Sequence, residues 1–210
     1  MAPPEARPAA TIVVARPGPD PGGRSEAAGI EVLMLRRSPG SSFAPGFLVF
    51  PGGSIDEGDA GLARRWFGTK AEAARACALR ELAEEAGLVL GRSGLVSMPG
   101  VAPGDPGFPA PRIEQVAEMA RWIAPDFLPV RFDARFFSVA APRGLEPHAN
   151  ATEVDGAWWM APADALRRQR EGSVSLMWPT LKVMEALEGC GSVRDVLALR
   201  VVQVAPPPPG

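Results

Sequence analysis

The stretch Glu72 to Leu88, EAARACALRELAEEAGL, decides which fold we expect for this chain of 210 residues. Glu81, Glu84 and Glu85 occupy positions i, i+3 and i+4, which share one face of an α-helix. Carboxylates that close repel one another, and a divalent cation that prefers oxygen ligands, such as Mg²⁺, removes that cost. The spacing predicts a metal site on a helix. The alternative is a solvated helix face held by an ion pair between Arg80 and Glu84.

Both ends of this helix are marked in the sequence. Thr69 and Glu72 form an S/T-x-x-E capping box, which predicts a helix start near Lys70. Gly87 favours the left-handed conformation that ends many helices. Between these ends, apolar residues recur on one face and predict packing against a sheet: Leu79, Leu82, Ala83 and Ala86.

A short strand and a glycine turn precede the helix. Phe47 to Phe50 is expected to be the strand, and Pro51-Gly52-Gly53 the turn. Glycines in such a turn let the backbone approach a phosphate or offer a carbonyl oxygen to a metal. On its own, this tripeptide is equally compatible with an ordinary turn.

Together these segments resemble the Nudix box, the signature of Mg²⁺-dependent hydrolases of nucleoside diphosphates linked to another group. The helical half matches at Glu72, Arg80, Glu81, Leu82, Glu84, Glu85, Gly87 and Leu88. Counted from Gly53 in the family's pattern, the first glutamate of the box would fall at Asp59. The matching Glu72 lies further along, so residues 59–68 are expected to be an insertion within the box. Trp66 and Phe67 are expected to pack it down.

The extended box is similar to that of a Nudix branch which includes the peroxisomal-type coenzyme A diphosphatases. The segments that carry this likeness are FPGG at 50–53, RFDARFF at 131–137 and EVDGAW at 153–158. The resemblance implies coenzyme A or an acyl-coenzyme A as substrate. The alternatives are the same chemistry on a sugar nucleotide, NADH, ADP-ribose or a dinucleoside polyphosphate, and a non-catalytic nucleotide sensor. The intact acidic trio argues against the sensor.

The resemblance also implies a role for each candidate residue. Arg80 is expected to orient a glutamate, and Glu72 to be structural. The general base is either Glu81 or Glu153. Arg36 and Arg37 precede the glycine turn at a strand end and are expected to face an anionic substrate. The candidate site therefore comprises catalytic Glu81, Glu84, Glu85, Arg80 and Glu153, metal ligands Glu81, Glu84, Glu85 and Gly53, and substrate-binding Gly52, Gly53, Arg36 and Arg37. The expected cofactor is Mg²⁺, with Mn²⁺ as a substitute.

Four other features each have a structural and a functional interpretation. Trp158 and Phe136 are either core residues or platforms for a base. His148 is either a surface loop residue or a phosphate or ribose contact. The run Arg167-Arg168-Gln169-Arg170 is interpreted as a solvated helix face.

Composition limits the partners and the compartment. The chain has 22 basic and 24 acidic residues, a net charge of −2, which does not favour nucleic-acid binding. The two cysteines, Cys77 and Cys190, do not suggest a disulfide framework, and a cytoplasmic protein is expected. We see no signal peptide and no run long enough to span a membrane. A nucleotide is the expected small-molecule partner, a homodimer is a further expectation, and the Ala, Gly, Pro and Arg bias is typical of high-GC bacteria.

The order of elements predicts an α/β protein, a Nudix α/β/α sandwich with a central mixed β-sheet. We expect a flexible tail at 1–10, the domain at 11–200 and a flexible proline-rich tail at 201–210. Strands are expected at 10–15, 30–36, 47–50, 131–140 and 156–160. Helices are expected from about 70 to 87 and at 111–123, 162–171, 179–188 and 193–199.

Overall fold

Strand β1 lies at the centre of the sheet. The computed structural model describes residues 3–19, 29–41, 44–102, 105, 110–150 and 154–206. On one edge β1 pairs in parallel with β8, and on the other it pairs antiparallel with β2 and β4. β3 and β9 pair with β2, and β7 with β8, which gives a seven-stranded mixed sheet. The strands are β1 (Arg7–Pro17), β2 (Ile30–Arg37), β3 (Leu48–Val49), β4 (Gly52–Ser54), β7 (Ala117–Ile123), β8 (Phe132–Ala140) and β9 (Val154–Met160).

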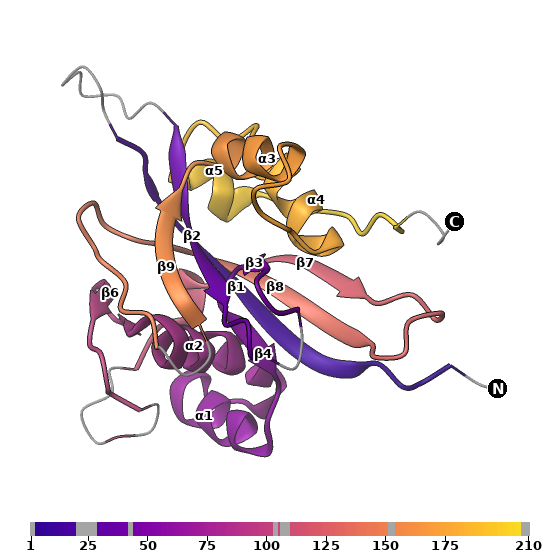
Figure 1. Cartoon of the computed structure of the whole chain (residues 1–210). Helices are drawn as coiled ribbons and strands as arrows, with labels where there is room; N and C mark the ends of the chain where they lie inside the picture. The colour runs from indigo at the N-terminus through magenta and orange to yellow at the C-terminus, as the bar shows by residue number, and fades with distance from the viewer. Residues whose placement is uncertain are drawn as a thin grey trace.

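Helices cover both faces of this sheet, so the expected α/β/α sandwich is confirmed (Figure 1). One apolar cluster joins the sheet to α2, and a second joins its opposite face to the three C-terminal helices. A separate hairpin, β5 with β6, follows α2 directly. The remaining elements are α1 (Glu57–Phe67), η1 (Lys70–Glu72), α2 (Ala73–Ala86), β5 (Leu88–Gly91), β6 (Gly94–Ser97), η2 (Ile113–Gln115), α3 (Pro162–Arg170), α4 (Trp178–Leu187) and α5 (Val193–Ala198).

The segment expected to be an insertion contains helix α1. Trp66 and Phe67 are partly buried and pack against the cluster beneath α2, together with Leu62 and Ala63. Gly68 ends the helix in the left-handed conformation, with φ of 77°. The insertion is therefore an ordered helical layer beside α2. No helix in the described ranges is long and apolar enough to cross a membrane.

Three expectations differ from the structure. Residues 111–123 are not helical: a short 3₁₀ turn, η2, leads into strand β7. Pro51-Gly52-Gly53 is not only a turn, because Gly52 and Gly53 pair with Thr11 and Ala10 inside β4. The tails are also shorter than expected. β1 begins at Arg7, and the amide of Val201 donates to the carbonyl of Met119 on β7.

Candidate metal and phosphate site

Helix α2 faces the glycine strand β4 through its acidic side. Glu85 is almost fully buried, and its Oε2 accepts a hydrogen bond of 2.9 Å from the amide of Gly52. A Cβ atom added at Gly53 would lie 2.6 Å from the carboxyl carbon of Glu81. Only a glycine therefore leaves room for the Glu81 carboxylate beside this strand.

Gly52 is required for a different reason. A Cβ atom there would lie 2.8 Å from the Cα atom of Thr11, on the neighbouring strand β1. The amide of Ile12 also donates to the carbonyl of Pro51, at 2.9 Å. The glycine pair thus holds β4 tightly against β1 on one side and admits the Glu81 carboxylate on the other.

Arg80 is enclosed by acidic groups. Its guanidinium donates to both carboxylate oxygens of Asp59, at 2.9 and 3.1 Å, and to Glu81 and Glu84 at 2.8 and 3.0 Å. It also donates to the carbonyl of Ser54. Burial by itself lowers the pKa of Arg80, but the hydrogen bonds to Asp59 and the charges of Glu81 and Asp59 outweigh burial and raise this pKa above its usual range. Arg80 is therefore a cation held by Asp59 that also binds two of the acidic side chains, Glu81 and Glu84.

Asp59 is the residue that our sequence analysis left without a role. It is fully buried and also accepts a hydrogen bond from the amide of Asp56 at the start of α1. Glu72, in contrast, pairs with Arg75 and not with Arg80. Thr69 caps the helix start by accepting from the amide of Ala71. The sequence did point to Asp59, because the family's spacing, counted from Gly53, places the first acid of the box at this position.

A thiol lies beside this network. Cys77 is buried, with its Sγ atom 3.3 Å from the carbonyl oxygen of Ser54. Burial raises the pKa of this thiol, and the charge of Asp59 raises it further. Cys77 is therefore protonated at neutral pH and acts as a small packing residue between α2 and β4.

The acidic side chains suit a hard divalent cation in their chemistry, since each offers carboxylate oxygens. Glu81 and Glu85 both lie against β4, and Glu84 is half exposed on the same side of α2. Within the described ranges, however, no group of three or more histidine, cysteine, aspartate or glutamate side chains is arranged to hold a metal ion. The hydrogen bonds to Arg80 and Gly52 orient these carboxylates as they stand, so metal binding would require them to turn.

Arg36 lies near the end of β2 and lines a pocket together with residues of β9 and α3. Its Nε donates to Asp155 at 2.6 Å, and its guanidinium lies 5.4 Å from the ring centroid of Trp158. The hydrogen bond to Asp155, followed by its charge, raises the pKa of Arg36. Trp158 is 40% exposed, whereas Phe136 is buried in the core. Phe136 is therefore a core residue, and Trp158 is accessible to a ligand.

The other candidate residues have different positions. Glu153 lies outside the described residues. Arg37 ends β2, where its carbonyl accepts from the amide of Gly46. His148 is exposed, and its amide donates to the carbonyl of Ala86 at the end of α2. This loop therefore packs on the acidic helix through its backbone.

Comparisons with known proteins agree with this geometry. A family model described as the NUDIX domain matches residues 6–178. A NUDIX hydrolase from Alicyclobacillus acidocaldarius is 29% identical, with a TM-score of 0.73 over 94% of this chain and 98% of its own. The MutT NUDIX hydrolase from Burkholderia pseudomallei is 17% identical, with a TM-score of 0.50 over 87% of this chain and 98% of its own.

A further solved NUDIX domain has the same fold. The NUDIX domain of Shewanella oneidensis NrtR, solved with ADP ribose, is 15% identical and has a TM-score of 0.51, with 92% of this chain and 90% of its own covered. No curated protein matches the sequence. The family match and the NUDIX hydrolase neighbours support a pyrophosphohydrolase. With a family model matched over most of its length, the chain belongs to the NUDIX domain family.

Proposed function

We propose that this protein is a Mg²⁺-dependent hydrolase that cleaves a pyrophosphate bond in a nucleoside diphosphate linked to another group, with coenzyme A or an acyl-coenzyme A as the first substrate to test. The observation that supports it best is the contact between α2 and β4. Glu85 accepts from Gly52, and Glu81 occupies the space that a side chain at Gly53 would fill. Mn²⁺ is expected to replace Mg²⁺.

The roles of the side chains follow from their positions. Glu81, Glu84 and Glu85 would hold the cation, with the carbonyl of Gly53 as a further oxygen. When bound, the cation neutralises the charge of the phosphoanhydride and lowers the pKa of a bound water. Arg80 positions Glu81 and Glu84, and Asp59 holds Arg80 in turn. The proton acceptor is either Glu81 or Glu153.

Other substrates remain alternatives within the same chemistry: NADH, ADP-ribose, a sugar nucleotide or a dinucleoside polyphosphate. A nucleotide sensor without catalysis is the second class of function. The intact acidic trio favours the enzyme. A homodimer and a cytoplasmic location also remain proposals.

Product analysis by mass spectrometry tests the proposal. The protein is incubated with Mg²⁺ and a mixture of coenzyme A, acetyl-coenzyme A, NADH, ADP-ribose and diadenosine polyphosphates. Loss of the coenzyme A species with formation of 3′,5′-ADP would support the first substrate. Loss of another nucleotide would keep the reaction and replace the substrate. No turnover of any nucleotide would favour the sensor.

Glu85→Gln is the matched inactive variant for this assay. The amide keeps an oxygen that accepts from Gly52 but removes the negative charge, so we expect turnover to fall about 100-fold or more with the fold retained. Glu72→Gln is the control, because Glu72 pairs with Arg75 at the start of the same helix. Near-wild-type turnover by Glu85→Gln would contradict the ligand assignment.

A further inference from the structure

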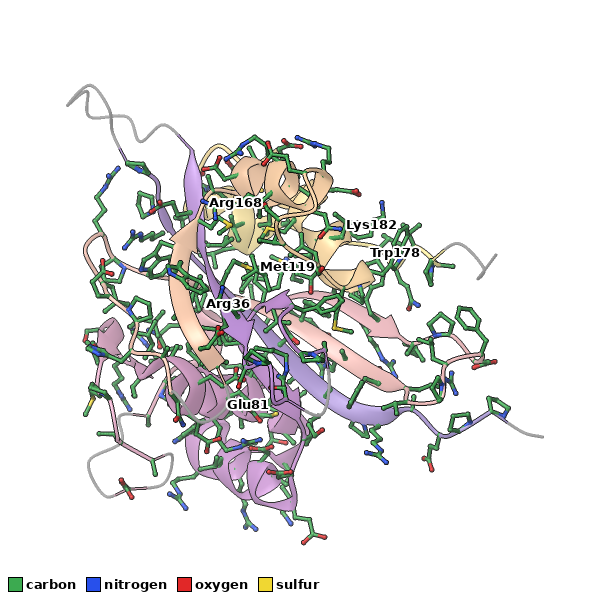
Figure 2. The ribbon with its side chains drawn as sticks, in the orientation of Figure 1. Arg36, Glu81, Met119, Arg168, Trp178 and Lys182 are labelled. Carbon is green, nitrogen blue, oxygen red and sulfur yellow. The ribbon has the colours of Figure 1, made fainter. Side chains whose placement is uncertain are left out.

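A pocket of about 740 Å³ opens on the face of the sheet that carries α3. Its lining comes from the end of β2, the start of β3, strand β9 and helix α3 with the turn that follows it. In Figure 2, Arg36 lies between Glu81 and Arg168 in projection. The acidic residues of α2 are not part of this lining, so the pocket is a region distinct from the proposed metal site. Its lining residues are Arg36, Pro39, Gly46, Leu48, Asp155, Trp158, Trp159, Met160, Asp164, Arg168, Ser173 and Val174.

Trp158 forms one wall of the pocket. A Cβ atom added at Gly156 would overlap its indole ring, so the ring lies across the backbone of β9 where another residue would have a side chain. Arg36 stands opposite Gly156 in the strand pairing and holds its guanidinium against the same ring. Glycine at position 156 thus permits an aromatic surface, partly exposed, to lie along the strand.

Both aspartates that line the pocket are already paired with an arginine. Asp155 is paired with Arg36, and Asp164 is paired with Arg167, which lies outside the lining. Among the described lining residues, Arg168 is the one cation for which the structure gives no carboxylate partner. Arg168 is exposed on α3. It belongs to the segment 167–170, which the sequence predicts to be a solvated helix face. Its side chain is therefore available at the pocket to an anionic group of a ligand.

Two direct connections join this pocket to the acidic helix. The chain leaves β3, whose Leu48 lines the pocket, and reaches Gly52 at the start of β4 after Phe50 and Pro51. On the other side, the amide of Asn150 donates to the carbonyl of Glu85, and the amide of Val154 at the start of β9 donates to Asn150. The pocket and the acidic helix are therefore linked through the backbone twice, by the chain between β3 and β4 and by the loop that leads into β9.

We propose that the pocket binds the nucleoside part of the substrate, with its base against Trp158 and a phosphate other than the hydrolysed diphosphate at Arg168. This inference rests on the proposed function. Guanidinium groups bind phosphate through charge-assisted hydrogen bonds, and an indole face accepts any base. The preferred substrates are therefore nucleotides that carry an additional phosphate on the ribose.

Matched pairs of nucleotides test this inference, because each pair differs by one ribose phosphate. The pairs are NADPH with NADH, and coenzyme A with dephospho-coenzyme A. We expect the wild type to have a higher kcat/KM for the phosphorylated member of a pair that it hydrolyses. Arg168→Gln should reduce that preference about tenfold or more, since it removes a charged hydrogen-bond donor. Arg170→Gln, at the end of the same helix and outside the lining, is the control and should leave the preference unchanged.

The Trp158→Leu variant tests binding of the base independently of binding of the ribose phosphate. It should raise KM for both members of a pair by about tenfold, without changing the ratio between them. Calorimetric titration of the same nucleotides into the Glu85→Gln variant, in the absence of turnover, gives the affinities directly. If the wild type hydrolyses nothing but binds the phosphorylated members more tightly through Arg168, the proposed function fails and this inference stands. Equal kcat/KM within each pair, equal affinity, or a preference that Arg168→Gln does not change would overturn it.

Discussion

At the scale of single residues, Asp59 and Glu72 are expected to contribute very differently to stability and turnover. Asp59 is fully buried and binds Arg80 through both oxygens, whereas Glu72 is partly exposed and pairs with Arg75. Removing one partner of a buried ion pair costs about 3–5 kcal/mol. We expect Asp59→Asn to lower the free energy of unfolding in urea by about that amount and to reduce turnover, because Arg80 loses its anchor.

Glu72→Gln provides the comparison for this prediction. Arg75 would keep its 3.0 Å hydrogen bond to the carbonyl of Val116, so we expect a loss of about 1 kcal/mol or less and normal turnover. A larger effect of Glu72→Gln than of Asp59→Asn would mean that the first acid of the box is Glu72 after all.

A second prediction concerns Gly53. An added methyl group would collide with the Glu81 carboxylate, so we expect Gly53→Ala to lower turnover about 100-fold while the unfolding temperature changes little. Gly61→Ala in α1 is the control, because a Cβ atom there meets nothing within 4 Å. In a helix that change should stabilise by about 0.5–1 kcal/mol. Full activity of Gly53→Ala would show that Glu81 need not lie where the structure places it.

Much of the acidic site could be predicted from the sequence, because helical spacing alone places Glu81, Glu84 and Glu85 on one side of α2. Arg80 could be predicted for the same reason. The pairing of Arg80 with Asp59 could not be predicted from helical spacing, since Asp59 lies 21 positions earlier, on the separate helix α1. The role proposed for Arg168 could not be predicted from the sequence either, because its surroundings come from β2 and β9, far away in the sequence.

At the scale of elements, β7 shows why one expected helix was wrong. Val116, Met119 and Ala120 are all buried, a spacing that is typical of a helix face. In the structure the register between β7 and β8 shifts between Glu118 and Ala120. Because of this bulge, the consecutive residues Met119 and Ala120 are both buried. A strand therefore has the spacing of buried residues that is typical of a helix.

The free edge of β7 gives the third prediction. The side chain of Gln203 accepts from the amide of Ile123 at 3.1 Å and donates to its carbonyl at 2.8 Å, as a neighbouring strand would. We expect Gln203→Ala to accelerate hydrogen exchange at the Ile123 amide and to cost about 1 kcal/mol of stability. Val202→Ala, at a side chain that is 81% exposed, should change neither quantity. Unchanged exchange at Ile123 in the first variant would show that this contact does not protect the edge.

At the scale of the whole molecule, we expect the stability of the fold to depend little on the metal. Apolar clusters on both faces of the sheet hold the layers together, and the acidic residues already have partners in Arg80 and Gly52. We therefore expect a chelator to abolish hydrolysis while the unfolding temperature falls by only a few degrees. Restored turnover on adding Mg²⁺ or Mn²⁺ is the control. Hydrolysis that persists in chelator would reject the proposed mechanism.

The parallel pairing of β1 with β8 has a consequence for the order of folding. Arg7 to Ala15 pair with Phe132 to Ala140, so more than half of the chain must be synthesised before the central strand has its parallel partner. Pairing over such a separation slows folding, because a long loop has to close first. β4 pairs with β1 through Gly52 and Gly53, so we expect β4 to be fully stabilised only after β8 has emerged from the ribosome and completed the sheet around β1. The candidate site would therefore be completed late in synthesis, although its signature is encoded early in the gene.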